Sequence, residues 1–436
     1  MRSLDYGKDA DMGGDKLAIL VGGGPAPGIN CVIGAATIRA RLGAVEVLGI
    51  RDGFEHIMKG DTSAVVPLDI DDVSRIHFRG GSILGIARAN PTSAPALLET
   101  TVRSLLELGV DKLLTIGGDD TAFSALKLEA AASGRLRVVH VPKTIDNDLD
   151  LPPDIDTFGF QTARAVGAEL VKNLMVDAYT THRWYFVIAM GRKAGHLALG
   201  IGKAAGATLT LIPEEFGSDG FPLSTLVDTL AGAILKRAAS GRRDGVAVIA
   251  EGVVLGVRPQ DLDGADNVER DEHGHVRIAE IDIGDLLKRA VRKRLAGLGV
   301  KATIVSKDIG YELRCADPIP FDMEYARDLG YCAARFLIEG GNASMVSMQG
   351  GNFVAVPFSS MLDSKTGRAR VRLVDVSSTR YGIARRYMIR LRGDDFGDHK
   401  SLAALAATAN LSPAVFREQF AYLTESETEL LELVRN

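Results

Sequence analysis

Short, unbroken apolar runs that each end at a glycine-rich or polar turn dominate the pattern of this 436-residue chain. Runs of this length without polar alternation are typical of parallel strands that are buried on both faces. Helical patterns lie between them, such as residues 96–108, with Ser93 as the expected N-cap, and residues 223–235 after Pro222. Alternating strands and helices of this kind predict a doubly wound α/β fold. The expected strands are residues 17–21, 113–116, 138–141, 185–190, 209–212 and 246–250.

Length and composition narrow the class of protein further. The length exceeds that of a typical single domain and favours two α/β lobes. A net charge of -5 gives no indication of nucleic-acid or anionic-membrane binding, so we expect small-molecule partners. No run reaches the roughly 18 apolar residues of a membrane helix, and the polar start lacks the apolar core of a signal peptide. Cys31, Cys315 and Cys332 are widely separated, which predicts neither a disulfide framework nor a zinc site and fits a cytoplasmic location.

A glycine-rich turn, GGGPAPGIN at residues 22–30, directly follows the first apolar run. Glycines let backbone N–H groups approach an anion closely, and the start of the following helix adds a favourable dipole. The spacing matches neither a dinucleotide fingerprint nor a P-loop, because Ile29 and Asn30 stand where a P-loop has Lys and Ser or Thr. The turn is therefore either a phosphate-binding loop of another type or a tight structural turn.

Acidic clusters follow the next two strands. Asp119 and Asp120 stand in GGDDT, where a helix is expected to begin, and Asp146 and Asp148 stand with Lys143 in PKTIDND. Carboxylate oxygens hold Mg²⁺ beside a substrate's phosphates, although two acids at a helix start are also typical of an N-cap. In PKTIDND one carboxylate can take a hydroxyl proton, while the lysine neutralises charge on a phosphoryl group in transit.

A cationic motif, MGRKAGH at residues 190–196, follows the strand at residues 185–190, and Arg183 stands just before that strand. Arginine side chains bind phosphate through two parallel hydrogen bonds, so Arg183 and Arg192 are candidates for phosphate contacts. Polar clusters at several strand ends are harder to explain as turns than a single cluster. Ligands of doubly wound folds bind at the carboxyl ends of the strands, which is where these residues are expected.

The ordered set GGGPAPGIN, GGDDT, PKTIDND, MGRKAGH, VAVIAEG and GYELR resembles the 6-phosphofructokinase family over roughly residues 16–340. The resemblance implies two Rossmann-like doubly wound lobes with largely parallel sheets and an active site in the cleft between them. It also implies a homodimer or homotetramer. We expect a flexible N-terminus (1–15), a donor phosphate-binding lobe (16–180), a sugar-phosphate-binding lobe (181–345) with a polar insertion (256–277), and a partly helical C-terminal segment (346–436) that packs back on both lobes.

The resemblance also assigns roles to individual residues. Asp146 stands where the family has the base for the sugar 1-hydroxyl, and we expect Lys143, Asp120 and Arg192 to act in catalysis with it. Asp119 and Asp148 match the positions that support Mg²⁺, or Mn²⁺ in its place. Gly23 and Arg88 match contacts to the donor phosphate, and Arg183 matches an arginine that reaches the neighbouring subunit's sugar phosphate. The remaining residues expected to bind the sugar phosphate are Thr144, Met190, Gly191, Glu251, Tyr311 and Arg314, of which Tyr311 replaces a common His.

The choice of phosphoryl donor depends on two positions. ATP-using members generally have Gly where this chain has Asp120 and Lys143, and pyrophosphate users have the residues found here. A carboxylate where the third phosphate of ATP would lie repels it by about 4 kcal/mol, for unit charges about 4 Å apart at an effective dielectric near 20. The predicted reaction is reversible phosphoryl transfer from pyrophosphate to fructose 6-phosphate, giving fructose 1,6-bisphosphate and phosphate in glycolysis and gluconeogenesis.

Other functions stay as alternatives. One is an ATP-dependent 6-phosphofructokinase, and another is a non-catalytic, sugar-phosphate-sensing homologue, which would be expected to lose Asp146 or Asp119. NAD and lipid kinases share a GGD-type phosphate loop but lack PKTIDND and MGR. Sedoheptulose 7-phosphate is an alternative acceptor, because one more hydroxymethylene unit leaves the reacting end unchanged.

Overall fold

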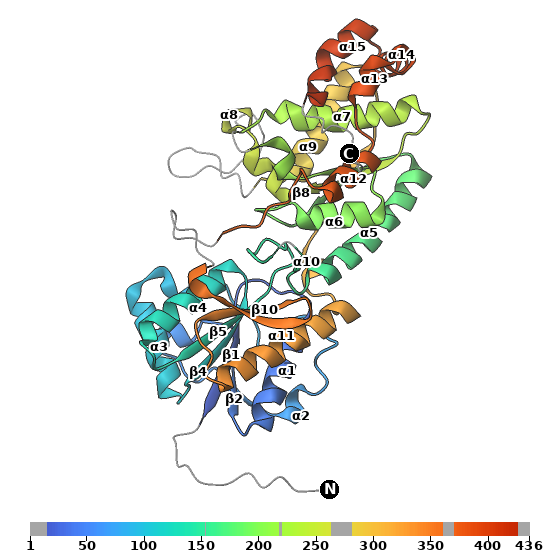
Figure 1. Cartoon of the computed structure of the whole chain (residues 1–436). Helices are drawn as coiled ribbons and strands as arrows, with labels where there is room; N and C mark the ends of the chain where they lie inside the picture. Colours follow the sequence, from blue (N-terminus) through green and yellow to red (C-terminus); the bar gives the residue numbers. More distant parts are fainter. Residues whose placement is uncertain (1–14, 153, 218–219, 263–280, 361–369, 426–436) are drawn as a thin grey trace, which may run out of the picture. The chain divides into compact units, whose positions relative to one another are not determined.

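The computed structural model describes residues 15–152, 154–217, 220–262, 281–360 and 370–425 (Figure 1). The expected N-terminal segment, apart from its last residue, and most of the polar insertion (263–277) lie outside these ranges. The chain divides into two compact units, and it passes between them within the PKTIDND motif. The first unit comprises residues 1–144, 149–162 and 314–370, and the second comprises residues 145–148, 163–313 and 371–436.

A seven-stranded sheet forms the middle of the first unit, in the order β11-β10-β5-β4-β1-β2-β3. Its five central strands are parallel, and the edge strands β3 and β11 are antiparallel to their neighbours. The strands are β1 (Lys16–Val21), β2 (Glu46–Ile50), β3 (Val65–Leu68), β4 (Lys112–Gly117), β5 (Arg137–Pro142), β10 (Ser344–Gln349) and β11 (Asn352–Pro357).

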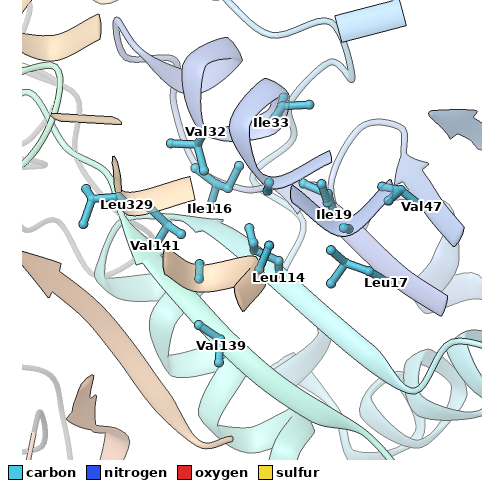
Figure 2. Close-up of a cluster of buried hydrophobic side chains, with 14 of the residues drawn as sticks. Leu17, Ile19, Val32, Ile33, Val47, Leu114, Ile116, Val139, Val141 and Leu329 are labelled. Atoms are coloured by element: carbon cyan, nitrogen blue, oxygen red, sulfur yellow. The ribbon is translucent and has the colours of Figure 1, made fainter. Parts of the chain in front are cut away.

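Helices cover both faces of this sheet. α1 (Ile29–Leu42) and α11 (Pro320–Ile338) lie on one face, and α3 (Pro95–Glu107) and α4 (Asp119–Ala132) lie on the other (Figure 1). Leu17 and Ile19 of β1 pack toward α1 and α11 in the cluster of Figure 2, whereas Ala18 and Leu20 pack toward α3 and α4. Both faces of the strand are buried, which explains why its sequence is an unbroken apolar run. Full burial of one such leucine or isoleucine contributes about 1.5–3 kcal/mol.

The second unit contains a four-stranded parallel sheet in the order β7-β8-β6-β9. Every residue of β6 and β8 is buried, as their apolar sequences predict. α6 packs on β7 and β8, and α7 packs against α9 and α14. The strands are β6 (Trp184–Ala189), β7 (Leu209–Leu211), β8 (Gly245–Ala250) and β9 (Ile304–Ile309). The main helices are α5 (Phe160–Thr181), which begins in the first unit, α6 (His196–Ala205), α7 (Leu223–Ala239), α9 (Ile283–Gly297), α12 (Thr379–Tyr387), α14 (His399–Thr408) and α15 (Pro413–Phe420).

Short elements complete the described chain. The four- and five-residue helices are α2 (Ile70–Val73), α8 (Pro259–Leu262), α10 (Tyr311–Arg314) and α13 (Gly393–Gly397). The 3-10 turns are η1 (Ile57–Lys59), η2 (Pro91–Ser93), η3 (Pro213–Phe216), η4 (Glu251–Gly256), η6 (Phe358–Ser360) and η7 (Ala421–Thr424). In the described part of the chain, no helix combines the length and hydropathy needed to cross a bilayer.

The predicted strands and helices form, with differences at their ends. Each expected apolar run forms a strand, and the helix expected at residues 223–235 continues to Ala239. The expected N-cap Ser93 is wrong: Ala94 is the N-cap of α3, and Ser93 belongs to η2. Pro95 explains the shift, because proline lacks the backbone N–H that the first helical residue does not need.

The division of the chain into units differs from the consecutive segments that the sequence suggested. Residues 314–345 join the first unit rather than the second, because β10 pairs in parallel with β5. The remaining C-terminal residues divide between the units: β11 extends the first sheet, and α12, α14 and α15 belong to the second unit.

Candidate active site

Three motif loops of the first unit emerge at one edge of its sheet. β5, β4 and β1 are adjacent and parallel, with Val21 opposite Ile116 and Gly117 opposite Pro142. Their carboxyl ends are therefore level. The glycine-rich turn, the GGDDT motif and the start of PKTIDND follow these ends, as the doubly wound fold requires of a ligand site.

Hydrogen bonds from the first two backbone N–H groups of the glycine-rich turn hold the turn in place. Gly22 donates its N–H to the Ile116 carbonyl at 2.9 Å, and Gly23, at φ 83°, donates to the Ala87 carbonyl at 3.1 Å. These two hydrogen bonds within the protein fix the course of the turn at the end of β1. The bridge between Gly22 and Ala87 brings the neighbouring Arg88 beside the turn, with an exposed side chain.

Two cations lie against the same turn. Lys143 is 4% exposed, and its Nζ donates a hydrogen bond to the Gly24 carbonyl. A Cβ on Gly23 would lie 3.6 Å from Lys143 Nζ, and a Cβ on Gly24 would lie 2.8 Å from Arg314 Nη1. Only glycine therefore fits at position 24 without displacing Arg314. The arrangement supplies local positive charge for an anion in a protein whose net charge is negative.

The two acids of GGDDT are the first residues of α4. Gly118 is the N-cap and makes no side-chain capping bond, so the alternative of an acidic N-cap is wrong. Asp119 Oδ1 accepts the Asp120 N–H at 3.0 Å, and the Asp120 side chain is exposed. Carboxylates in the first turn interact favourably with the helix dipole. Both acids therefore stand at the sheet edge without serving as caps.

His140, which the sequence interpretation missed, connects the strands that carry these loops through hydrogen bonds of its ring. Its ring is fully buried in β5, and Nε2 donates to the Gly117 carbonyl at 2.9 Å. Nδ1 accepts the Thr115 hydroxyl at 2.8 Å, and the same Gly117 carbonyl accepts the Lys143 N–H at 2.8 Å. Burial lowers the pKa of His140 to about 3, so the ring stays neutral. A lone histidine inside an apolar strand was the available signal.

The rest of PKTIDND belongs to the second unit, where Arg372 holds it. The Arg372 guanidinium donates to the Asn147 carbonyl through Nε at 3.1 Å and Nη2 at 3.0 Å, and its backbone N–H donates to the Asp148 carbonyl at 2.9 Å. Asn147 has φ 58°, a left-handed conformation that asparagine tolerates better than most residues. Arg372 thereby fixes the turn that carries Asp146 and Asp148. No local signal identified it in the sequence.

The loops of the second unit that follow β6, β8 and β9 also share one edge. Ala189 is opposite both Ala250 and Ile309, so these three strands end level. Gly191 donates its N–H to Glu251 Oε1 at 3.2 Å, and Gly252 donates to the Gly191 carbonyl at 3.2 Å. A Cβ on Gly252 would lie 2.3 Å from the carbonyl oxygen of Arg192, which only glycine avoids. MGR and Glu251 thus form one fixed group.

A cavity of about 380 Å³ opens beside this group. Met190, Arg192, Glu251 and Tyr311 line it, and Arg192 Nε lies 4.0 Å from Glu251 Oε1. Asp282, Asp308 and Glu312 also line it. Burial, together with the neighbouring Asp282, raises the pKa of Asp308. The cavity has the size of a small-ligand site and offers both hydroxyl acceptors and one cation.

Arg183 does not lie beside the group formed by MGR and Glu251 in the same chain. It precedes β6, whereas Met190 follows it, and a six-residue strand spans about 20 Å. Its nearest carboxylate is Asp177, with Nε to Oδ2 at 3.9 Å. Thr144 and Arg314 belong to the first unit. Of the other residues expected at the sugar site, five lie together in the second unit: Met190, Gly191, Arg192, Glu251 and Tyr311.

Parallel sheets with polar and cationic loops at their carboxyl ends define a doubly wound α/β protein with anion-binding sites. The family model "Phosphofructokinase" matches residues 16–337, and the chain belongs to that family. The "Pyrophosphate--fructose 6-phosphate 1-phosphotransferase" of Thermotoga maritima is 53% identical over 416 residues, which are 94% of this chain and 99% of that protein. The protein of the same name from Naegleria fowleri is 48% identical, over 94% of this chain and 96% of its own.

A solved structure supports the architecture. The pyrophosphate-dependent phosphofructokinase of Marinobacter aquaeolei is similar with a TM-score of 0.64 at 16% identity, over 91% of this chain and 92% of that chain. At this identity the likeness concerns the fold alone. The predicted fold class, two doubly wound lobes with largely parallel sheets, is confirmed.

Proposed function

We propose that this chain is a pyrophosphate-dependent 6-phosphofructokinase that moves a phosphoryl group from pyrophosphate to the 1-hydroxyl of fructose 6-phosphate. The products are fructose 1,6-bisphosphate and phosphate, and the reaction runs in both directions. The observation that carries the proposal is the buried Lys143 ammonium on the glycine-rich turn, because ATP users of the family generally have glycine at that position. Relatives that share about half of the sequence carry the corresponding enzyme name.

The chemistry requires alignment and charge neutralisation more than a covalent intermediate. Asp146 is the base that takes the proton of the 1-hydroxyl as the oxygen attacks the phosphorus. Lys143 and Arg192 neutralise negative charge that builds up on the transferring group and the leaving phosphate. Gly23 and Arg88 hold the donor. The sugar phosphate contacts Thr144, Met190, Gly191, Glu251, Tyr311 and Arg314.

Asp120 excludes ATP in this proposal. Its exposed carboxylate stands in the first turn of α4, beside the loop that follows β4. A third phosphate in that region would meet both its bulk and its charge. Lys143 favours pyrophosphate because a cation stabilises the phosphate that leaves.

Enzymes of this family use a divalent cation, generally Mg²⁺. Within the described ranges, no group of three or more His, Cys, Asp or Glu side chains could hold a metal ion by itself. This pattern fits Mg²⁺, which binds one or two carboxylates and takes its other ligands from phosphate oxygens and water. Asp119 and Asp148 are the proposed carboxylates, and the ion, or Mn²⁺ in its place, would supply charge neutralisation at the donor.

The position of Arg183 supports a homo-oligomer. Because it lies at the far end of β6 from Met190, we infer that it serves the sugar site of a neighbouring subunit. The enzyme is then at least a homodimer, and light scattering at assay concentration should show no fully active monomer. We keep the cytoplasm as the proposed location, on the cysteine pattern alone.

The direct test is an assay with each donor on the unmodified enzyme and two variants. Pyrophosphate should support turnover, and ATP should be a very poor donor. Asp120→Gly should admit ATP measurably. Lys143→Gly should instead reduce pyrophosphate use by roughly 10²–10³-fold, the usual loss for one charged transition-state contact.

Asp150→Gly is a matched control, because Asp150 is an exposed acid paired with Arg370 rather than with a motif loop. Equal use of ATP and pyrophosphate by the unmodified enzyme would overturn the donor assignment. If the unmodified enzyme showed no turnover with either donor, the assignment as a kinase would be overturned.

A further inference from the structure

A second polar pocket lies in the second unit, away from the sugar cavity. It has a volume of about 160 Å³ and is enclosed by η3, α7, α12 and η7. η3 follows β7, which is at the opposite edge of the four-stranded sheet from β9. None of its lining residues lines the sugar cavity. The lining residues are Glu215, Phe216, Thr225, Thr229, Val376, Tyr381, Arg385, Arg390, Tyr422 and Leu423.

The charge of this lining is positive. It contains two guanidinium groups, Arg385 and Arg390, and one carboxylate, Glu215. Arg390 is 7% exposed, and its Nη1 donates to Glu215 Oε2. Asp228 stands behind Tyr422 but is already engaged, because it accepts the Tyr422 hydroxyl at 2.9 Å and Arg294 Nε at 2.7 Å. One guanidinium charge therefore has no carboxylate of its own among the lining residues.

Arg385 is that group. Its nearest carboxylate oxygen is Glu215 Oε2 at 3.7 Å, which Arg390 already binds. Arg385 Nη1 is buried and makes no hydrogen bond within the described residues. Buried guanidinium N–H groups are almost always paired, so the adjoining space should contain an acceptor. Tyr381 also lines the pocket, and burial together with the nearby Glu215 raises the pKa of its hydroxyl and keeps it protonated.

The size of the pocket indicates which hydrogen-bond acceptor it can hold. A single water occupies about 30 Å³ of liquid, so the space exceeds one water. It is smaller than the roughly 300–1,000 Å³ of pockets that hold drug-sized ligands. Arginine side chains prefer oxyanions that accept two parallel hydrogen bonds. We propose that this pocket binds one phosphate-sized oxyanion, inorganic phosphate, through Arg385 and Arg390.

The proposal concerns binding and does not depend on the reaction assigned above. Inorganic phosphate is titrated calorimetrically into the enzyme after two ligands have been added to saturation. They are fructose 6-phosphate, which fills the sugar-phosphate site, and methylenediphosphonate, a pyrophosphate analogue that cannot transfer its phosphoryl group. The unmodified enzyme should bind one phosphate per chain. Arg385→Leu should weaken this binding by about 10–100-fold, as expected for a lost charge-assisted contact.

Arg386→Leu is the matched control, because Arg386 is the next residue of α12 and its side chain is exposed. It should bind phosphate as the unmodified enzyme does. A crystal structure from phosphate solution gives a second readout, and should show a tetrahedral anion against Arg385. Arg385→Lys, which keeps the charge but loses the planar pair of donors, replaces the leucine variant if that variant does not fold.

Three results would overturn the proposal. The first is the absence of binding heat when phosphate is added to the unmodified enzyme. The second is equal phosphate affinity of the Arg385 and Arg386 variants. The third is a crystal structure at high phosphate concentration that shows only water in the pocket. Phosphate heat that appears only when methylenediphosphonate is omitted belongs to the donor site and counts as the first of these results. Failure of the kinase assay with intact phosphate binding would leave this site standing and remove only the proposed reaction.

Discussion

Replacing His140 by glutamine should make the stability of the protein less sensitive to acid. The imidazole is fully buried beneath the GGDDT and PKTIDND loops, with Nε2 donating to the Gly117 carbonyl at 2.9 Å. Glutamine keeps a donor for that carbonyl but cannot take up a proton. The change therefore separates the hydrogen bond from the titration.

The sign and size of this effect on the free energy of unfolding follow from the linkage between proton binding and folding. Burial lowers the pKa of His140 to about 3 in the fold, against 6.5 for an ordinary histidine. Between these values the unfolded chain binds a proton that the folded chain does not, so the free energy of unfolding falls as pH falls below about 6.5. Between pH 7.5 and pH 5.5 the loss from this residue is about 1.4 kcal/mol. His140→Gln should lack this loss.

Two measurements check the prediction. Urea unfolding at pH 7.5 and 5.5, followed by circular dichroism, should give a pH dependence that is about 1.4 kcal/mol smaller for His140→Gln than for the unmodified enzyme. His399→Gln is the control for the loss of a histidine, since its side chain is exposed. In the unmodified enzyme, the NMR signal of the His140 ring carbon should not titrate above pH 4.5.

Two outcomes would refute the reasoning. A His140 signal that titrates near pH 6.5 would show that burial does not hold the ring neutral. Equal pH dependence of unfolding in His140→Gln and the unmodified enzyme would show that another group sets the acid sensitivity.

Turnover gives a separate test of the same hydrogen bond. Reduced turnover of His140→Leu, with normal turnover of His140→Gln, would identify the Nε2 hydrogen bond as the contact that positions Gly117 and Lys143.

Three further predictions concern the site itself. Asp146→Asn should lower turnover by about 10²–10⁴-fold with little change in KM, because a general base is lost, and near-normal turnover of the folded variant would remove it from that role. Arg372→Lys should lower kcat about tenfold, equivalent to roughly 1.4 kcal/mol, because lysine cannot hold the Asn147 carbonyl with two donors. Arg370→Lys, whose partner is Asp150, should leave kcat unchanged, and equal losses in both variants would contradict a positioning role. Exhaustive chelation should abolish turnover and Mg²⁺ should restore it, whereas undiminished turnover would show that lysine and arginine neutralise the donor unaided.

The sequence by itself determined the strands and the loops that carry the motifs. Runs such as residues 17–21 and 246–250 are apolar on both sides because helices or loops cover both faces of each strand. The motifs were expected to follow strands, because ligands of doubly wound folds bind at the carboxyl ends of the strands. The expected strands, the fold class and the donor-type residues Asp120 and Lys143 could therefore be identified from the printed residues.

The tertiary structure decided what depends on contacts between distant segments. β10 completes the first sheet by pairing with β5, across about 200 residues, and Arg372 holds Asn147 across 225 residues. His140 becomes a link between loops only because the neighbouring strand β4 places Thr115 opposite it and the Gly117 carbonyl within hydrogen-bonding distance. None of these pairings leaves a local mark, because a strand or an arginine has the same local sequence whichever partner it finds. Local patterns fix which segment becomes a strand or a loop, and only packing fixes which residues meet.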